Sequence, residues 1–142
     1  MPAAEAVDLA TVEQLRLSLF RLSRRLRKRS EIGLTPSQQS AMSTIERHGP
    51  VRLSRLGELE QINKSSVTRL VAKLEARGLI ARLPDADDGR SWQLALTPAG
   101  RRLMDESSMR ANTYLARQIA ALTAGDQRRI LEVIPVLQRL LE

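Results

Sequence analysis

The 142-residue sequence has no cysteine and a single histidine. The absence of cysteine excludes disulfide bonds, thiolate metal sites and sensing by thiol oxidation. The sequence also lacks a close pair of carboxylates in an apolar setting and a glycine-rich loop that would cradle phosphates. These are groups from which catalytic sites are commonly built. We therefore expect no enzyme, no bound metal and no cofactor.

Long apolar runs are missing too, and the longest is far below the roughly 18 residues that a membrane span needs. The start of the sequence carries acids at Glu5 and Asp8 and no basic stretch ahead of an apolar one, which argues against a signal peptide. We expect no membrane association and a cytoplasmic location.

Positive charge is concentrated in the first two thirds of the sequence, which has a net charge of +7. Residues 1–51 have eight Lys/Arg against five Asp/Glu, residues 52–102 have ten against six, and residues 103–142 have five against five. A basic body with a neutral C-terminal part suits a polyanion as partner, and a generally basic soluble surface is the alternative.

Aromatic residues make up only 2% of the chain. They are Phe20, Trp92 and Tyr114. Because proteins that bind single strands or RNA usually offer aromatic stacking platforms, duplex DNA is the favoured nucleic acid.

The spacing of apolar residues predicts a mainly α protein with a small β-hairpin. In the first element Leu15, Leu19, Leu22 and Leu26 recur at intervals of four, three and four, which is typical of one face of a helix. Two short strands flank a polar turn and predict the hairpin. The expected elements are helices at about 8–29 and 36–48, a short strand at 51–53, helices at 54–61 and 64–77, strands at 79–83 and 92–96, and helices at 98–122 and 124–141.

Side chains that cap helices mark where most of these helices begin. The expected N-caps are Thr35, Ser54, Asn63, Thr97 and Thr123. Gly78 is expected to close a helix in the left-handed conformation. Pro135 lies within the last apolar pattern, so it should either kink that helix or separate two shorter ones.

The segment 63–74 has the two faces that a DNA recognition helix needs. Such a helix exposes short polar and basic side chains to base edges and holds an apolar face against its domain. The inward residues are Val67, Leu70, Val71 and Leu74. The outward residues, expected to face DNA, are Lys64, Ser65, Ser66, Thr68, Arg69 and Lys73. Small hydroxyls permit a close approach and Arg69 can reach guanine O6 and N7; the alternative is a surface helix with a solvated polar face.

The turn between the two strands combines acids, a glycine and one arginine over residues 85–90. A lone arginine on a loop can enter a minor groove, where narrow A·T-rich stretches concentrate negative potential. We expect Arg90 to do so, with Asp88 accepting hydrogen bonds from Arg90 and setting its direction. The alternative is an ordinary charged turn whose acids repel phosphates.

Three segments of the sequence follow a known pattern. They are Asn-Lys-Ser-Ser-Val-Thr-Arg-Leu-Val-Ala-Lys-Leu-Glu-Ala-Arg-Gly-Leu-Ile-Ala-Arg (63–82), Asp-Asp-Gly-Arg-Ser (87–91) and Leu-Ala-Leu-Thr-Pro-Ala-Gly (94–100). A recognition helix ending in Leu-Glu-x-x-Gly-Leu-Ile, a wing with Asp-x-Arg and a strand running into Leu-Thr-x-x-Gly are the pattern of the MarR family. The sequence resembles that family over essentially its whole length.

The resemblance implies a winged helix-turn-helix with N- and C-terminal dimerisation helices, as one MarR-like domain over residues 1–142. The DNA-binding lobe would span about 35–100, and the dimerisation region about 8–30 and 101–142. Major-groove contacts are implied for Ser65, Ser66, Thr68 and Arg69. Arg90, steadied by Asp88, would enter the minor groove, and the residues expected to donate to phosphates from helix starts are Thr35, Ser37 and Ser54.

The resemblance also implies a ligand-responsive homodimer, a repressor by default, on a pseudo-palindromic operator with half-site centres about 34 Å apart. Its effector would be a small aromatic or phenolic molecule. The candidate residues for the effector pocket are Phe20, Met42, His48 and Tyr114. For His48 the alternative is that it only ends a helix and does not sense a ligand. A non-specific architectural DNA-binding protein and a winged helix used only for protein contacts stay open as other functions.

Overall fold

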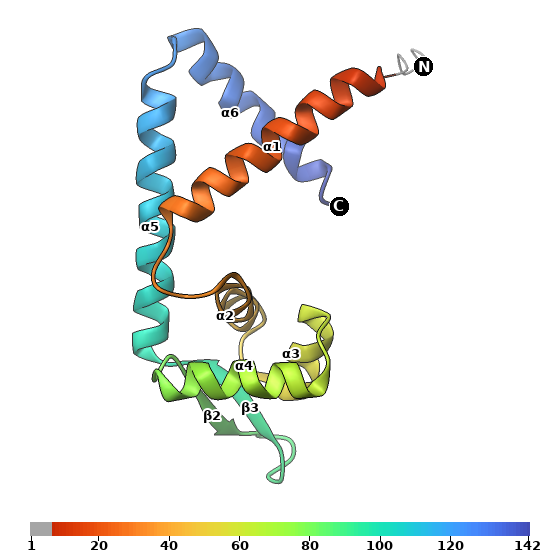
Figure 1. Cartoon of the computed structure of the whole chain (residues 1–142), viewed down its shortest axis with the longest axis vertical. Helices are drawn as coiled ribbons and strands as arrows, with labels where there is room; N and C mark the ends of the chain where they lie inside the picture. The colour runs from red at the N-terminus through yellow and green to blue at the C-terminus, as the bar shows by residue number, and fades with distance from the viewer. Residues whose placement is uncertain (1–6) are drawn as a thin grey trace. The chain divides into compact units, whose positions relative to one another are not determined.

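The computed structural model describes residues 7–142; residues 1–6, on which the expectation about a signal peptide partly rests, lie outside the described residues. In residues 7–142 the chain forms six helices and three strands (Figure 1). They are α1 (Leu9–Arg29), α2 (Pro36–His48), β1 (Val51–Arg52), α3 (Leu53–Glu60), α4 (Lys64–Ala76), β2 (Ile80–Pro84), β3 (Trp92–Leu96), α5 (Pro98–Ala120) and α6 (Ala124–Arg139). Within that range no helix is long and apolar enough to span a membrane. The predicted mainly α fold with a small β-hairpin wing is confirmed.

Hydrogen bonds from capping side chains confirm the predicted starts of α2, α4 and α6. Thr35 Oγ1 accepts from the N–H of Gln38 at 3.2 Å, and Gln38 Oε1 accepts from the N–H of Thr35 at 3.0 Å, which makes a capping box. Asn63 Oδ1 accepts from the N–H of Ser66 at 2.8 Å, and Thr123 caps α6 in the same way. Each bond satisfies an N–H that has no partner inside its helix, so it fixes where the helix begins.

The structure corrects one expectation about helix boundaries and excludes one of the two alternatives for Pro135. The N-cap of α3 is Arg52 and not Ser54, which is the second residue of the helix. Arg52 is held extended (φ −69°, ψ 151°) because it pairs with Gln93 in the sheet, so α3 begins directly where β1 ends. Pro135 does not separate two helices, since α6 is continuous. Proline has no N–H, so the helix lacks the hydrogen bond from residue 135 to the carbonyl of Leu131. Leu131 is exposed, so water can bond to that carbonyl instead.

The three strands form an antiparallel sheet in the order β1-β3-β2. β2 and β3 pair along their whole length, with Ile80 opposite Leu96 at one end and Pro84 opposite Trp92 at the other. β1 joins the free edge of β3, where Val51 lies opposite Leu94. The short strand predicted at 51–53 thus becomes the third strand of the wing and ties the hairpin to the helices.

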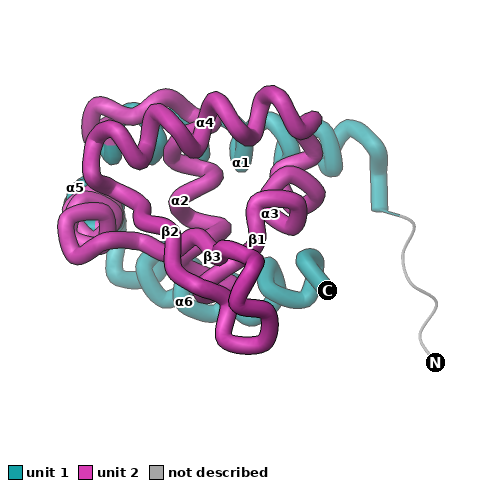
Figure 2. Tube along the Cα trace, turned by 90° about the horizontal axis from the view of Figure 1, so that it is seen from below, with its two compact units in different colours: residues 1–30, 109–142 teal, residues 31–108 magenta. Residues whose placement is uncertain are grey.

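The chain divides into two compact units, shown in different colours in Figure 2. The winged unit consists of residues 31–108, and the helical unit consists of the residues up to Ser30 together with 109–142. The predicted lobe of about 35–100 lies within the winged unit, and its role and that of the dimerisation region remain predictions. The core of the winged unit is formed by the buried side chains of Ala41, Met42, Ile45, Val51, Leu56, Val67, Val71, Leu74, Leu79, Ile80, Leu94 and Met104.

Gly100 lies where the start of α5 presses against the backbone that follows α4. A Cβ atom at this position would overlap the carbonyl oxygen of Leu79 and lie 3.3 Å from Met42 Cε. The same carbonyl accepts from the N–H of Thr97 at 3.1 Å, and Thr97 Oγ1 donates to the carbonyl of Gly78 at 2.6 Å. Thr97 Oγ1 also accepts from the N–H of Gly100 at 3.0 Å. The absence of a side chain at Gly100 permits this close approach.

Gly100→Ala is therefore expected to destabilise the winged unit, because the added methyl group requires α5 to move away from Leu79. The free energy of unfolding should fall by about 1–3 kcal/mol, measured by urea denaturation followed by circular dichroism.

Gly125→Ala is the matched control for that substitution. A Cβ at Gly125 meets only Thr123 Oγ1 at 3.9 Å, an ordinary contact, so the control should leave stability unchanged or raise it by up to about 1 kcal/mol. Equal stabilities of the two variants would contradict the assigned role of Gly100.

Candidate nucleic-acid interface

α4 has the two faces predicted for it. Val67, Val71 and Leu74 are buried in the core, and Leu70 is half-buried. The exposed residues of the other face are Lys64, Ser65, Thr68, Arg69 and Lys73, while Ser66 is half-buried. Because the apolar side is locked in the core, the direction in which the polar side faces is fixed by packing.

Two hydroxyl groups at the start of α4 already donate hydrogen bonds within the protein. Ser65 Oγ donates to Asn63 Oδ1 at 3.0 Å, and Thr68 Oγ1 donates to the carbonyl of Lys64 at 2.7 Å. A hydroxyl has one hydrogen to donate and two lone pairs with which to accept. Ser65 and Thr68 therefore present acceptors on this face, and acceptors pair with the amino groups of adenine and cytosine in the major groove.

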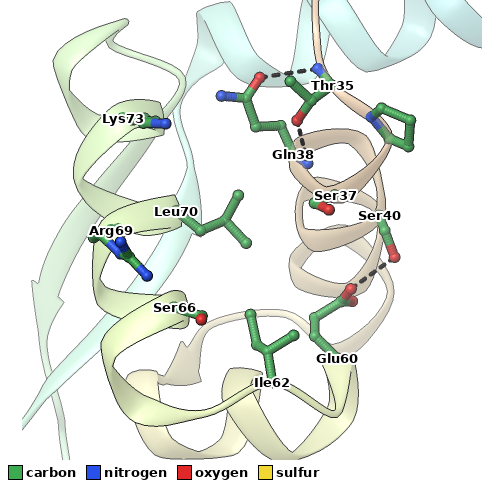
Figure 3. A pocket seen from close by; sticks show the side chains of 11 residues that line it. Thr35, Ser37, Gln38, Ser40, Glu60, Ile62, Ser66, Arg69, Leu70 and Lys73 are labelled. Atoms are coloured by element: carbon green, nitrogen blue, oxygen red, sulfur yellow. Dashed lines mark hydrogen bonds between the residues drawn. The ribbon is translucent and has the colours of Figure 1, made fainter.

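A groove of about 620 Å³ lies between the start of α2 and the exposed side of α4 (Figure 3). The predicted DNA-binding residues that line it are Thr35, Ser37, Ser66, Arg69 and Lys73. Hydroxyl groups from the start of α2 thus face two cations of α4 across the groove, with Leu70 and Ile62 pointing into it (Figure 3). A second hollow adjoins it at Arg69 and is lined by Lys64, Ser65, Thr68 and Arg69. The two hollows bring together eight residues that were predicted to contact DNA.

Glu60 is an acid in the groove that the sequence did not single out. Its carboxylate accepts hydrogen bonds from Ser40 Oγ at 2.7 Å and from Thr44 Oγ1, which join the end of α3 to α2 (Figure 3). An anion at this place disfavours a phosphate beside it, so phosphate contacts are better placed at Thr35 and Ser37. No local pattern pairs Glu60 with residues of another helix, and only the packing of α3 on α2 does so.

The other three predicted DNA-binding residues lie outside the two hollows. Ser54 is exposed in the first turn of α3. Asp88 and Arg90 lie at the exposed tip of the wing, where the backbone N–H of Arg90 donates to Asp88 Oδ1 at 3.0 Å and Ser91 Oγ donates to Asp88 Oδ2 at 3.0 Å. We expected Asp88 to orient the side chain of Arg90, but the bond that forms shapes the turn through the backbone instead. An Asp side chain commonly accepts from the backbone N–H two residues further along and so forms such a turn.

An ion pair between Arg52 and Asp85 at the root of the wing was not predicted. Arg52 Nε lies 2.8 Å and Arg52 Nη2 2.6 Å from Asp85 Oδ2, and Asp85 Oδ1 accepts from the N–H of Asp87 at 3.0 Å. The hydrogen bond from Asp87, followed by the one from Arg52, holds the pKa of Asp85 below its ordinary value of 3.8. The pair joins residues 33 positions apart, a separation at which a sequence gives no pairing signal.

The four candidates for an effector pocket come from both units. Met42 is fully buried in the core of the winged unit, and its contact with a ligand stays a prediction. His48 is exposed at the last position of α2, in line with the alternative of a helix-end residue. Phe20 and Tyr114 belong to the helical unit, where Arg16 lies over the ring of Phe20 and the Arg29 guanidinium carbon lies 4.9 Å from the ring centre of Tyr114.

Comparison with known proteins agrees with this geometry. The sequence model of the MarR family matches residues 34–92, from the start of α2 to the start of β3. The transcriptional repressor MdtR of Bacillus subtilis is 31% identical over 91 residues, which are 64% of this chain and 59% of MdtR. An HTH-type transcriptional regulator of Mycobacterium tuberculosis is 29% identical over 84% of this chain and 85% of its own. A crystal structure of a regulator protein from Pseudomonas aeruginosa superimposes with a TM-score of 0.83 at 30% identity, over 96% of this chain and 97% of the other.

The chain belongs to the MarR family. It is accordingly a winged helix-turn-helix transcriptional regulator that binds DNA, as the sequence predicted. In this MarR-family protein the helix-turn-helix is formed by α3 and α4, and the wing by β2 and β3. The individual DNA-contacting residues remain predictions.

Acid is expected to loosen the wing of this MarR-family regulator through Asp85. Because the pKa of Asp85 is lower in the folded protein than in the unfolded chain, its bonds stabilise the fold fully above the ordinary value of 3.8 and are lost as the pH falls through the folded value. The amide resonance of Asp87, whose N–H donates to Asp85 Oδ1, should report this in an NMR titration from about pH 6 to about pH 3.

Asp85→Asn is the control for the titration, since it removes the carboxyl group of Asp85 and should abolish the contribution of that group to the change at the Asp87 amide. A midpoint at or above 3.8 in the wild-type protein would contradict the assignment.

Proposed function

We propose that the protein is a homodimeric, ligand-responsive repressor that binds a pseudo-palindromic operator with α4 of each protomer in a major groove. The observation that carries this proposal is the single polar surface formed by the exposed side of α4 and the start of α2, which the groove unites. On this surface Arg69 is the one side chain that belongs to both hollows, so it is the central candidate for base readout.

The remaining residues of that surface divide by chemistry into two roles. Lys64, Ser65, Ser66, Thr68 and Lys73 accompany Arg69 along α4 and would contact base edges or the adjoining backbone. Thr35, Ser37 and Ser54 lie at the starts of α2 and α3, where N–H groups and the positive end of the helix dipole favour phosphate. Arg90 at the wing tip would enter the minor groove, with Asp88 shaping the turn that carries it.

Dimerisation is supported by the apolar faces of α1 and α6. Neither helix contains a buried residue within the described part of the chain, although both carry an apolar stripe. The large apolar side chains exposed on them are Leu9, Val12, Leu15, Leu17, Leu19, Phe20, Leu22, Leu131, Val133, Ile134 and Val136. A surface of this kind needs a partner in water, and a second copy would place two recognition helices about 34 Å apart.

An effector would act by changing that separation, since both recognition helices fit successive major grooves only at one spacing. We propose a small aromatic or phenolic ligand, with Phe20, Tyr114 and His48 as the candidate contacts that reach a surface. Repression is proposed because MdtR, the relative with 31% identity, is a repressor. A regulator of transcription acts on chromosomal DNA, which supports a cytoplasmic location.

Arg69→Ala is expected to lower operator preference. The operator is first selected from genome fragments, and its affinity is then compared with that of a scrambled duplex at about 150 mM salt. The wild-type preference should be at least about a thousandfold, and the variant should lose about 1–3 kcal/mol of discrimination because the guanine contact is gone.

Arg128→Ala is the matched control for Arg69→Ala, since it removes the same charge from an exposed position of α6. Equal binding of wild-type protein to both duplexes would replace the proposal with a non-specific architectural role. Absence of binding to either would leave a winged helix used for protein contacts.

Leu15→Glu combined with Ile134→Glu is expected to dissociate the dimer, because the two charges would be buried in the proposed interface. Light scattering at micromolar concentration should give twice the 15.9 kDa chain mass for wild type and the chain mass for the variant. Leu83→Glu, on the exposed wing, is the control and should stay dimeric. A monomeric wild-type protein would refute the homodimer.

A further inference from the structure

Arg52 joins the root of the wing to the body of the winged unit. It lies in β1, at the edge of the sheet away from β2, and it is also the N-cap of α3. Asp85 directly follows β2 at the opposite edge. The ion pair therefore bridges the two outer strands, with the middle strand β3 between them.

The carboxylate of Asp85 is the fixed part of this bridge. The Asp85 side chain is only 4% exposed, whereas that of Arg52 is 50% exposed. Asp85 Oδ2 is paired with Nε and Nη2 of Arg52, and Asp85 Oδ1 accepts a hydrogen bond from the N–H of Asp87. A buried carboxylate whose two oxygens are both bonded has one defined orientation, because rotating it would break bonds at each oxygen.

The loop beyond the sheet depends on the same residue. The ladder between β2 and β3 ends at Pro84 and Trp92, and past that point the N–H of Asp85 donates to the carbonyl of Ser91 at 3.0 Å. Residues 86–90 are exposed, and their position is set by the bonds of Asp85 and Asp88. A change at Asp85 is therefore transmitted to the whole wing tip.

We propose that Arg52 is a positioning residue for DNA binding: through Asp85 it holds the wing loop in the direction from which Arg90 enters the minor groove. This inference rests on the proposed function of the wing. It assigns to Arg52 a role that acts through Arg90 and not through its own contact with a phosphate.

A double-mutant cycle on operator affinity tests this role. Arg90→Ala should weaken binding by about tenfold through loss of the minor-groove contact, and Arg52→Gln should weaken it by a similar or smaller factor. In the Arg90→Ala background, Arg52→Gln should have no further effect, because no guanidinium is left to position. A residue that only supports the fold would weaken binding in both backgrounds.

Arg55→Gln is the matched control for the cycle. It removes the same charge three residues further along from a side chain of similar exposure, and its partner is Glu58 on its own helix. The effects of Arg55→Gln and Arg90→Ala on operator affinity should be independent of each other. Additive losses for Arg52→Gln and Arg90→Ala would overturn the proposal, since they would mean that Arg52 either contacts a phosphate itself or only supports the fold. Unchanged binding by Arg52→Gln would overturn it as well.

Trp92 supplies a readout that needs no DNA. It is the single tryptophan of the chain, it lies opposite Pro84 next to Asp85, and it is 55% exposed. Arg52→Gln should increase quenching of its fluorescence by acrylamide, whereas Arg55→Gln should not, and equal quenching in the two variants would overturn the proposal. Arg69→Ala distinguishes a failure of this inference from a failure of the proposed function. If Arg69→Ala lowers operator preference while the losses in the Arg52 and Arg90 cycle are additive, the proposed function stands and the role of Arg52 fails.

Discussion

The peptide groups of Gly78 and Leu79 are the point at which the elements of the winged unit are joined. The N–H of Leu79 ends α4 by donating to the carbonyl of Leu74. The carbonyls of Gly78 and Leu79 accept from Thr97 at the end of the hairpin. Gly78 takes φ 69°, and the bare backbone of Gly100 presses on Leu79. The directions of the recognition helix, the wing and α5 are consequently set by one contact. The motifs Gly-Leu-Ile and Leu-Thr-x-x-Gly are the two sides of it.

The surface proposed to contact DNA is less basic than the net charge of the protein suggests. Arg69 and Lys73 share their groove with Glu60, and the hydroxyls of Ser65 and Thr68 have their hydrogens engaged. Charge on phosphates gives affinity that salt weakens, whereas acceptors and donors in fixed positions discriminate between bases. A recognition surface with few cations and oriented polar groups is suited to the second task.

The exposed wing loop and the exposed helices α1 and α6 are stabilised by different interactions. In the wing, buried Asp85 and the turn at Asp88 define a loop too long for strand pairing alone. In α1 and α6 the apolar stripes give each helix its amphipathic character, but they remain exposed within the chain. The first arrangement is complete in a single chain, while the exposed stripes of α1 and α6 are the basis of the proposed dimer.

Local sequence determined most of the secondary structure and the family. Periodicity placed the helices, and side chains such as Thr35 and Asn63 marked their starts because a cap bonds within its own turn. The two faces of α4 followed from the same short-range spacing. Pattern reasoning misplaced the start of α3, because pairing of Arg52 with β3 and not a hydroxyl at Ser54 fixes it.

Only the tertiary structure decided which distant residues meet. It placed Glu60 against Ser40 and Thr44, and it joined Arg52 to Asp85. The physical reason is range. Caps and helix faces depend on neighbours within about four positions, whereas these contacts are set by how helices and strands pack, and a single sequence carries no local sign of that.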